Sequence, residues 1–173
     1  MGGLYDAFRL EAKFSDASEE QKIIAELLKE LHSTDVLVGI PEENSARNPD
    51  GSRPDGGPVD NVDLLYIHSN GSPLQGIPAR PVLEPAMSAN AERLGEMLDK
   101  AADAAMDGSA DGMRRALESA GMAGQNAARA WFTDPRNGWA PNAPETVRRK
   151  GSSRPLIDTG ELRKSITYVV RKK

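Results

Sequence analysis

The stretch PAMSANAERLGEMLDKAADAAM (residues 85–106), followed by DGS (107–109) and ADGMRRALESAGMAGQNAARAW (110–131), decides the fold. Apolar or small side chains recur in both long pieces at the three- and four-residue spacing of an amphipathic helix. The two stripes are Met87, Ala91, Leu94, Leu98, Ala101 and Ala105, then Met113, Ala116, Leu117, Ala120, Ala123, Ala127 and Trp131. Pro85 suits a first helical turn. The sequence therefore predicts an antiparallel pair of long helices, and Gly121 and Gly124 would let another backbone approach closely.

Strand-like segments flank this helical pair on both sides. LYDAFRLEAKF (residues 4–14) alternates apolar and polar side chains with a period of two, as does SITYVV (165–170), so we expect strands there. DVLVGIP (35–41) predicts a short buried strand. We therefore expect an α+β fold with a small, mostly antiparallel sheet, built from the N-terminal strand and strands near 36–40 and 165–171.

A shorter amphipathic helix is expected between the first two strands. Ser18 and Gln21 have the spacing of a capping box. The apolar stripe that follows is Ile23, Ile24, Leu27, Leu28 and Leu31. A second short helix is expected over residues 61–68 with Asn61 as its cap, followed by an extended, proline-rich connection over 71–81.

Two other segments carry few apolar residues. Residues 42–60 (EENSARNPDGSRPDGGPVD) are dense in Pro, Gly, Asn and Asp, which predicts a flexible insertion loop. Residues 140–155 (APNAPETVRRKGSSRP) predict an extended basic connection. The segments on both sides of the loop are firmly patterned, so we expect residues 1–173 to form a single domain.

Composition narrows the class of protein further. The chain has 173 residues, of which 38 % are hydrophobic and 28 % charged, and it has no cysteine. The absence of cysteine excludes disulfides and thiolate metal sites and fits a reducing cytosolic origin. We expect no secretory signal and no membrane-spanning segment, because no basic-then-apolar N-terminus and no run of about 18 apolar residues occurs.

Charge is distributed unevenly along the chain. Residues 1–135 hold 12 Lys/Arg and 23 Asp/Glu, a net charge of −11, whereas residues 136–173 hold 10 Lys/Arg and 3 Asp/Glu, a net charge of +7. An acidic body and a basic end can pair head to tail between copies, present a basic face to a polyanion, or form an ordinary solvated surface. The candidate assembly interface consists of Arg148, Arg149, Lys150, Arg154, Arg171, Lys172 and Lys173.

PLIDTGEL (155–162) contains the Asp-Thr-Gly of an aspartic protease loop. Such proteases need two of these loops facing each other within an almost all-β domain. Only 13 residues follow Gly160, and the preceding region is helical, so a structural turn is favoured. In that interpretation Asp158 caps a short helix with Glu161 at its third position, and the turn Asp158, Thr159, Gly160 and Glu161 reverses the chain before the last strand.

Other catalytic or cofactor patterns are missing from the sequence. The histidines are His32 and His68, with no metal-ligand spacing, and the glycines of the 42–60 loop lack a strand–turn–helix frame for phosphate. We expect His68 to satisfy a carbonyl at a helix end. No catalytic residue, cofactor or metal is therefore predicted. Arg163 and Lys164 add to the basic residues between Arg148 and Lys173, but Tyr168 is the only aromatic residue among them, so nucleic-acid binding would be limited to the phosphate backbone.

Several segments, taken in order, resemble a known family. VLVGIP, a polar loop, LLYIHSNGSPLQGIPARPVLEPAM, two helices and GWAPNAPETVRRKGSSRPLIDTGELRKSITYVV follow the order seen in the tail-completion proteins of tailed bacteriophages, the minor-tail-protein-Z-like and virion-morphogenesis group. The matching positions are Tyr66, Ile67, His68, Gly71, Ile77, Pro78, Ala79, Arg80, Pro81, Pro85, Trp139, Pro141, Thr146, Pro155 to Gly160, Leu162, Ser165 and Ile166. The resemblance covers about residues 35–170.

This resemblance implies a non-enzymatic structural protein at the neck of a virion, made in the bacterial host cytoplasm, that forms a ring or collar around the DNA channel. Its partners would be copies of itself and other neck and tail proteins on the portal and tail-tube sides, with DNA contacted, if at all, without sequence readout. It also implies that Asp-Thr-Gly is a structural turn. Tail-terminator and head-closure roles stay open, and a basic nucleic-acid-binding module is the alternative from another class.

Overall fold

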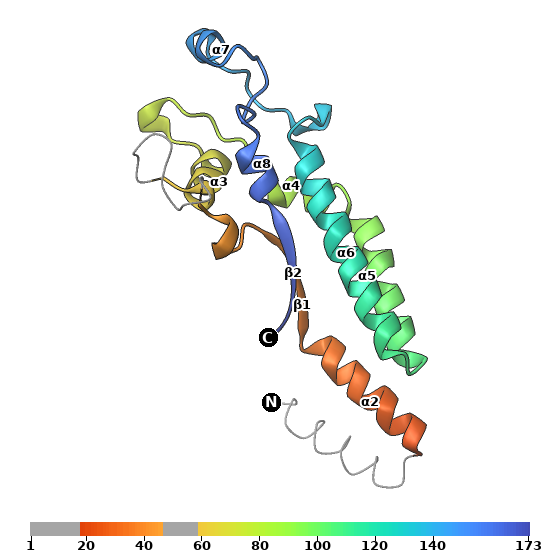
Figure 1. Cartoon of the computed structure of the whole chain (residues 1–173). Coiled ribbons are helices and arrows are strands. Elements are labelled where there is room, and N and C mark those ends of the chain that lie inside the picture. The colour runs from red at the N-terminus through yellow and green to blue at the C-terminus, as the bar shows by residue number, and fades with distance from the viewer. Residues whose placement is uncertain (1–17, 47–58) are drawn as a thin grey trace, which may run out of the picture.

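The computed structural model describes residues 18–46 and 59–173, and within these ranges the fold is α+β, as expected (Figure 1). The expected strand over 4–14 and the 47–58 part of the loop lie outside the described residues. The elements in chain order, with 3₁₀ helices written η, are α2 (Glu19–His32), β1 (Thr34–Gly39), η1 (Glu42–Asn44), α3 (Asn61–Asn70), η2 (Pro73–Gln75), α4 (Leu83–Ser88), α5 (Ala91–Met106), α6 (Ala110–Trp131), η3 (Pro135–Asn137), α7 (Pro144–Lys150), α8 (Glu161–Ser165) and β2 (Thr167–Lys172).

The molecule is elongated, with the α5–α6 hairpin along one side (Figure 1). The β1–β2 ribbon packs on α6, α5 packs on the other side of α6, and α2 packs on α5. In Figure 1, α2 and the α5–α6 turn lie at one end, whereas α3, η2, α7 and α8 lie at the other. We call these the hairpin end and the arm end.

The expected helical pair is present, but its first helix is interrupted. α4 ends at Ser88 and α5 begins at Ala91, whereas the sequence predicted one helix from Pro85 onward. The amide of Asn90 donates to the carbonyl of Ala86 at 2.8 Å, so a side chain competes for a carbonyl of the preceding helical turn. Asn90 leaves helical geometry with φ −119° and ψ 12°, which separates the two helices.

The two strands form an antiparallel ribbon in which Thr34 pairs with Lys172 and Gly39 with Thr167. Val36 and Val170, directly opposite each other, pack toward the α2–α5–α6 cluster. The strand expected over 35–41 is present as β1, but it is half-buried and not buried as expected, and Leu37 is 40 % exposed. Within the described residues the ribbon has only two strands, so helices cover one face and leave the other open.

Glycine on α6 sets how closely the ribbon approaches the hairpin. A Cβ at Gly121 would lie within van der Waals overlap of the Tyr168 ring, and one at Gly124 would lie 2.8 Å from Cγ2 of Val38. The buried face of α6 therefore runs through Gly121, Gly124 and Ala128. Ala123 and Ala127, which the sequence placed on the stripe, are only half-buried, because α6 packs against the ribbon as well as against α5.

Helix α2 begins as expected but buries less than its stripe suggests. Ser18 and Gln21 form a reciprocal capping box, with hydrogen bonds of 3.0 and 3.3 Å. Only Leu27 is fully buried, whereas Ile23 and Leu28 are 50 % and 37 % exposed. The helix contacts α5 along one narrow line, so part of its apolar face is left at the surface of the hairpin end.

The start of one helix and two connections differ from expectation. Helix α3 is capped by Asp60, whose carboxylate accepts from the Asp63 amide at 2.9 Å, so Asn61 is the first helical residue and not the cap. The 71–81 connection contains the short helix η2, and Ser72 and Ile77 form an isolated antiparallel bridge. The 140–155 connection is not extended throughout, because it contains α7. Proline, which is favoured in the first turn of a helix, begins α7 at Pro144.

We predict that Gly121→Ala destabilises the protein by about 1–3 kcal/mol, the range for overpacking, although alanine is the better helix former. The reason is the overlap of the new methyl group with Tyr168. Gly95→Ala is the matched control, because no atom lies within 4 Å of the position its Cβ would take on α5. Chemical denaturation should show it stabilised by up to about 1 kcal/mol. Equal responses of the two variants would contradict the assigned packing.

Candidate functional site

A buried arginine joins two distant segments at the arm end. Arg80 is 6 % exposed, and its Nε and Nη2 donate to the Ala140 carbonyl at 3.2 and 2.9 Å. Nη2 also donates to the Pro141 carbonyl at 3.2 Å. Hydrogen bonds from a charged donor are stronger than neutral ones, by roughly a factor of two. Arg80 therefore fixes the start of the 140–155 connection against the end of the 71–81 connection.

A tryptophan strengthens the same junction. Trp139 donates its indole Nε1–H to the Pro81 carbonyl at 3.1 Å. Its ring meets Phe132 edge to face, with centroids 5.9 Å apart. Phe132 belongs to the apolar cluster that holds α4, α6 and α8 together. Trp139 and Arg80 thus anchor the 140–155 connection to the core from two adjacent points, and we call them the Arg80–Trp139 clamp.

The end of α3 is built into the same junction. The backbone amide of Arg80 donates to the His68 carbonyl at 2.6 Å. Gly71, with φ 73°, ends α3, and a Cβ there would lie 2.7 Å from the Ala79 nitrogen. Only glycine fits this position, because the left-handed conformation and the close backbone approach both exclude a side chain.

His68 lies at the centre of this region, between two cavities. It lines a groove of about 940 Å³ together with Arg80 and Arg149, and a smaller cavity of about 380 Å³ together with Lys150 and Asp158. Burial, then the positive charges of Arg80 and Lys150, lower the pKa of His68. Its Nδ1 is buried without a hydrogen-bond partner among the described residues. We expected His68 to satisfy a carbonyl at a helix end, but its Nδ1 makes no such hydrogen bond.

The Asp-Thr-Gly turn has a structural geometry different from the predicted one. Helix α8 starts at Glu161, and its cap position is Gly160, so Asp158 is not the cap and Glu161 is not its third residue. The Thr159 hydroxyl accepts from the Glu161 amide at 3.4 Å. Gly160 adopts φ 82°, a left-handed conformation that favours glycine and reverses the chain before α8. Asp158 is exposed, and its charge raises the pKa of Lys150 against the larger lowering caused by burial.

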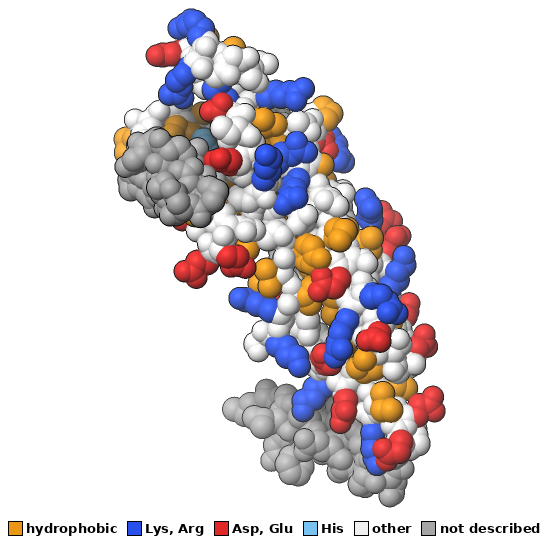
Figure 2. Space-filling view, viewed as in Figure 1, with side chains coloured by type: hydrophobic (Ala, Val, Ile, Leu, Met, Phe, Trp, Pro, Cys, Tyr) orange, Lys and Arg blue, Asp and Glu red, His pale blue; other side chains and the backbone are white. Residues whose placement is uncertain are grey.

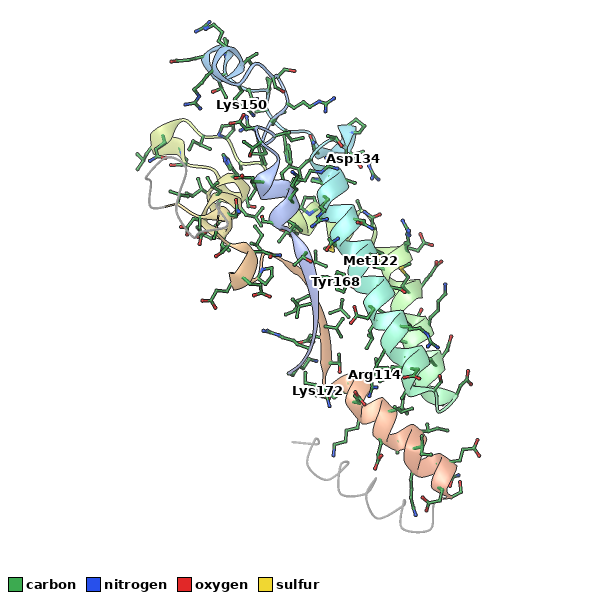
Figure 3. The ribbon with its side chains drawn as sticks, viewed as in Figure 1. Arg114, Met122, Asp134, Lys150, Tyr168 and Lys172 are labelled. Atoms are coloured by element: carbon green, nitrogen blue, oxygen red, sulfur yellow. The ribbon has the colours of Figure 1, made fainter. Side chains whose placement is uncertain are left out.

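The candidate assembly residues do not form one surface. Arg148, Arg149 and Lys150 occupy the last turn of α7, and Arg154 follows them, so these four belong to the arm end. Arg171, Lys172 and Lys173 lie at the end of β2, near α2. Figure 3 shows Lys150 far from Lys172, with the length of the ribbon between them.

The two basic groups also differ in their contacts. Lys173 lies 3.3 Å from Asp35 and donates to the His32 carbonyl at 3.2 Å, and Lys172 lies 4.0 Å from Glu30. These residues bind the ribbon to the end of α2. At the arm end, Lys150 donates to the Arg154 carbonyl at 3.1 Å, and Arg148 and Arg149 are exposed and make no ion pair with a described carboxylate. Figure 2 shows basic side chains over α7 and α8 with a few acidic ones among them, and side chains of both signs along the hairpin.

Sequence reasoning did not identify the Arg80–Trp139 clamp or the groove beside it. The only indication in the sequence was an arginine between prolines, in a connection without helical or strand periodicity. Its partners are backbone carbonyls 60 and 61 positions away, which no side-chain pattern reveals.

Comparison with known proteins supplies no relative: no family model, no curated protein and no solved structure matches the chain. Among the described residues, no three His, Asp or Glu side chains are placed to hold a metal ion. No helix within 18–46 and 59–173 is long and apolar enough to cross a membrane.

We predict that Gly160→Ala costs about 1–2 kcal/mol of stability, because a Cβ is disfavoured in the left-handed conformation although space for it exists. Asp158→Ala should change stability by less than about 0.5 kcal/mol, as expected for an exposed residue without a capping role. Urea unfolding of both variants measures the difference. A larger loss for Asp158→Ala would restore the original capping hypothesis.

His68 should make stability depend on pH. Its pKa in the folded protein is lower than the ordinary 6.5, so as pH falls the unfolded chain takes up a proton first, and stability decreases below about pH 6.5. At higher pH the histidine is neutral in both states and this contribution is fully present. The variant His68→Gln should lose stability less steeply between pH 6.5 and 5. Parallel curves from denaturant titrations of the two proteins would show that His68 is not the cause.

Proposed function

We propose that this protein is a non-enzymatic structural component of a tailed-phage neck, where it completes the tail as a subunit of a ring around the DNA channel. The observation that carries the proposal is the Arg80–Trp139 clamp. Two of the motifs that carry the family resemblance, IPARP and WAP, lie about 60 positions apart and meet there through hydrogen bonds to backbone carbonyls. The two motifs therefore build one structural unit, which supports reading them together.

The surface chemistry supports a role in assembly. Exposed apolar side chains occur at both ends of the molecule: Val62, Tyr66 and Leu74 at the arm end, and Ile23, Leu28 and Met106 at the hairpin end. Leu74 is fully exposed and Tyr66 is 71 % exposed, so a partner that covered them would gain the free energy of burying apolar surface. A ring needs two different complementary surfaces on each subunit, because head-to-tail contacts are heterologous. The two ends offer such a pair.

The basic arm suits protein contact better than a grip on DNA. A channel through which DNA passes should not hold phosphates, because each neutralised phosphate adds to a salt-dependent affinity. The acidic body of a neighbouring subunit offers an alternative counter-charge, since residues 1–135 carry a net charge of −11. Tail-terminator and head-closure roles at the same neck would use the same surfaces.

The proposal can be tested by measuring the mass of the purified protein alone and mixed with isolated tails. A ring alone, or a ring only on tails, agrees with the proposal. A monomer that never associates with tails, and tails that join heads without it, would contradict the proposal.

The variant Arg148→Ser/Arg149→Ser/Lys150→Ser should block joining of heads to tails and leave the folded protein intact, because the last turn of α7 contributes little to the core. A matched control, Arg93→Ser/Lys100→Ser/Arg115→Ser, removes the same charge from exposed positions of the hairpin and should keep most activity. In vitro complementation of particles gives the readout. Submicromolar binding of duplex DNA at physiological salt, lost in the arm variant alone, would favour the nucleic-acid module instead.

A further inference from the structure

The groove beside the Arg80–Trp139 clamp is a recess between two loops. One wall comes from the 70–79 segment and the other from the 141–149 segment, and the volume between them is about 940 Å³. The walls are largely prolines and small apolar residues, including Pro73, Pro78 and Pro141. Because each proline restricts the backbone, these walls are stiff and the recess is preformed.

The groove carries positive charge without a counter-ion. Its charges are those of Arg80 and Arg149, because His68, which also lines it, has a lowered pKa and is neutral near pH 7, and among the described residues no aspartate or glutamate lines the groove. Arg80 is buried, yet its hydrogen bonds go to two neutral carbonyls and none to a carboxylate. A buried cation without a charged partner is costly, and the carbonyl dipoles offset only part of that cost.

The charge of Arg80 also affects the pKa values of two neighbouring groups, His68 and Lys150. Burial is the largest cause of the lowered pKa values of His68 and Lys150, and the charge of Arg80 acts on both in the same direction. Lys150 has Asp158 as an opposing charge, but Asp158 lines the neighbouring smaller cavity and not the groove. A bound anion would therefore offset the unpaired charges of Arg80 and Arg149.

We propose that this groove is a binding site for carboxylate side chains of an acidic, extended segment of a partner protein. Arg149 at the rim would pair with one carboxylate, and Nη1 of Arg80 at the base would donate to another, because its Nε and Nη2 already donate to backbone carbonyls. The proline-rich walls would contact the apolar parts of the segment. Bidentate pairing of guanidinium and carboxylate favours arginine at the Arg149 position.

A protein segment fits better than duplex DNA. Arg80 is recessed, with 6 % of its surface exposed, and the phosphates of a duplex lie on a convex surface that cannot enter a recess between two loops. The inference rests on the groove alone and does not depend on the neck assignment. If copies of the chain do associate, their acidic bodies make a second copy an available partner.

The test is NMR titration of the full chain with a blocked hexaglutamate peptide, using a blocked hexaglutamine peptide as control. Signals of His68 and the two walls should shift with hexaglutamate and not with hexaglutamine. Arg149→Gln should weaken the affinity by roughly threefold or more, the size expected for one partly exposed ion pair. Arg148→Gln is the matched control, because it removes the adjacent α7 charge, which does not line the groove, and should leave the affinity nearly unchanged.

Three results would overturn the proposal. The first is no groove-centred shift with hexaglutamate at millimolar peptide. The second is equal weakening by the Arg148 and Arg149 variants, which would indicate attraction to the basic arm as a whole. The third is that a short DNA duplex shifts the groove signals at a lower concentration than hexaglutamate does and that this shift depends on Arg149. That result would assign the site to phosphate. Both variants change exposed residues, so thermal melting should confirm that they fold.

Discussion

A guanidinium that donates to backbone carbonyls holds the arm end of this protein together. Arg80 stands in a stretch without helix or strand, residues 78–82, and the segment it holds, around Ala140 and Pro141, has none either. Neither segment could order the other through periodic hydrogen bonds. The charged donor supplies the missing interaction, and Trp139 adds a second point of attachment, so two irregular loops become a rigid pair of walls. The two walls of the groove are held together by these two attachments.

The sequence predicted an element best where the periodicity of a helix or a strand, or the spacing of a helix cap, is visible in the pattern of its side chains. The stripes of the hairpin, the Ser18–Gln21 box and the alternation of residues 165–170 all correspond to observed elements. It failed where one side chain competes with a regular pattern. The side chain of Asn90 donates to a carbonyl of α4, the helix that ends just before it. Asp60 occupies the cap position that Asn61 was expected to hold. Both residue types favour such local bonds, so either position was a plausible boundary on composition alone.

The candidate site was less predictable than the fold for a different reason. Seven basic residues close together in sequence were expected to act together, but the chain runs through α8 and the ribbon between them, so three finish near α2 while four stay on the arm. A count of charge along the chain contains no information about that separation. At the Asp-Thr-Gly turn the chain reverses where the sequence predicted, but Asp158 is not the capping residue, because a left-handed glycine can start a helix without a side-chain cap.

The ribbon has a consequence for how the protein is made. β1 and β2 pair directly, yet Gly39 and its partner Thr167 are separated by almost all of the described chain. During synthesis at about 5–20 residues per second, β1 therefore leaves the ribosome on the order of ten seconds before its partner exists. Until β2 is made, Val36 and Val38 lack the partner strand that they have in the described structure, whereas α5 and α6, which are close in sequence, are complete before β2 and can pair first. We therefore expect the hairpin to form before the ribbon, which can close on α6 only once β2 is present.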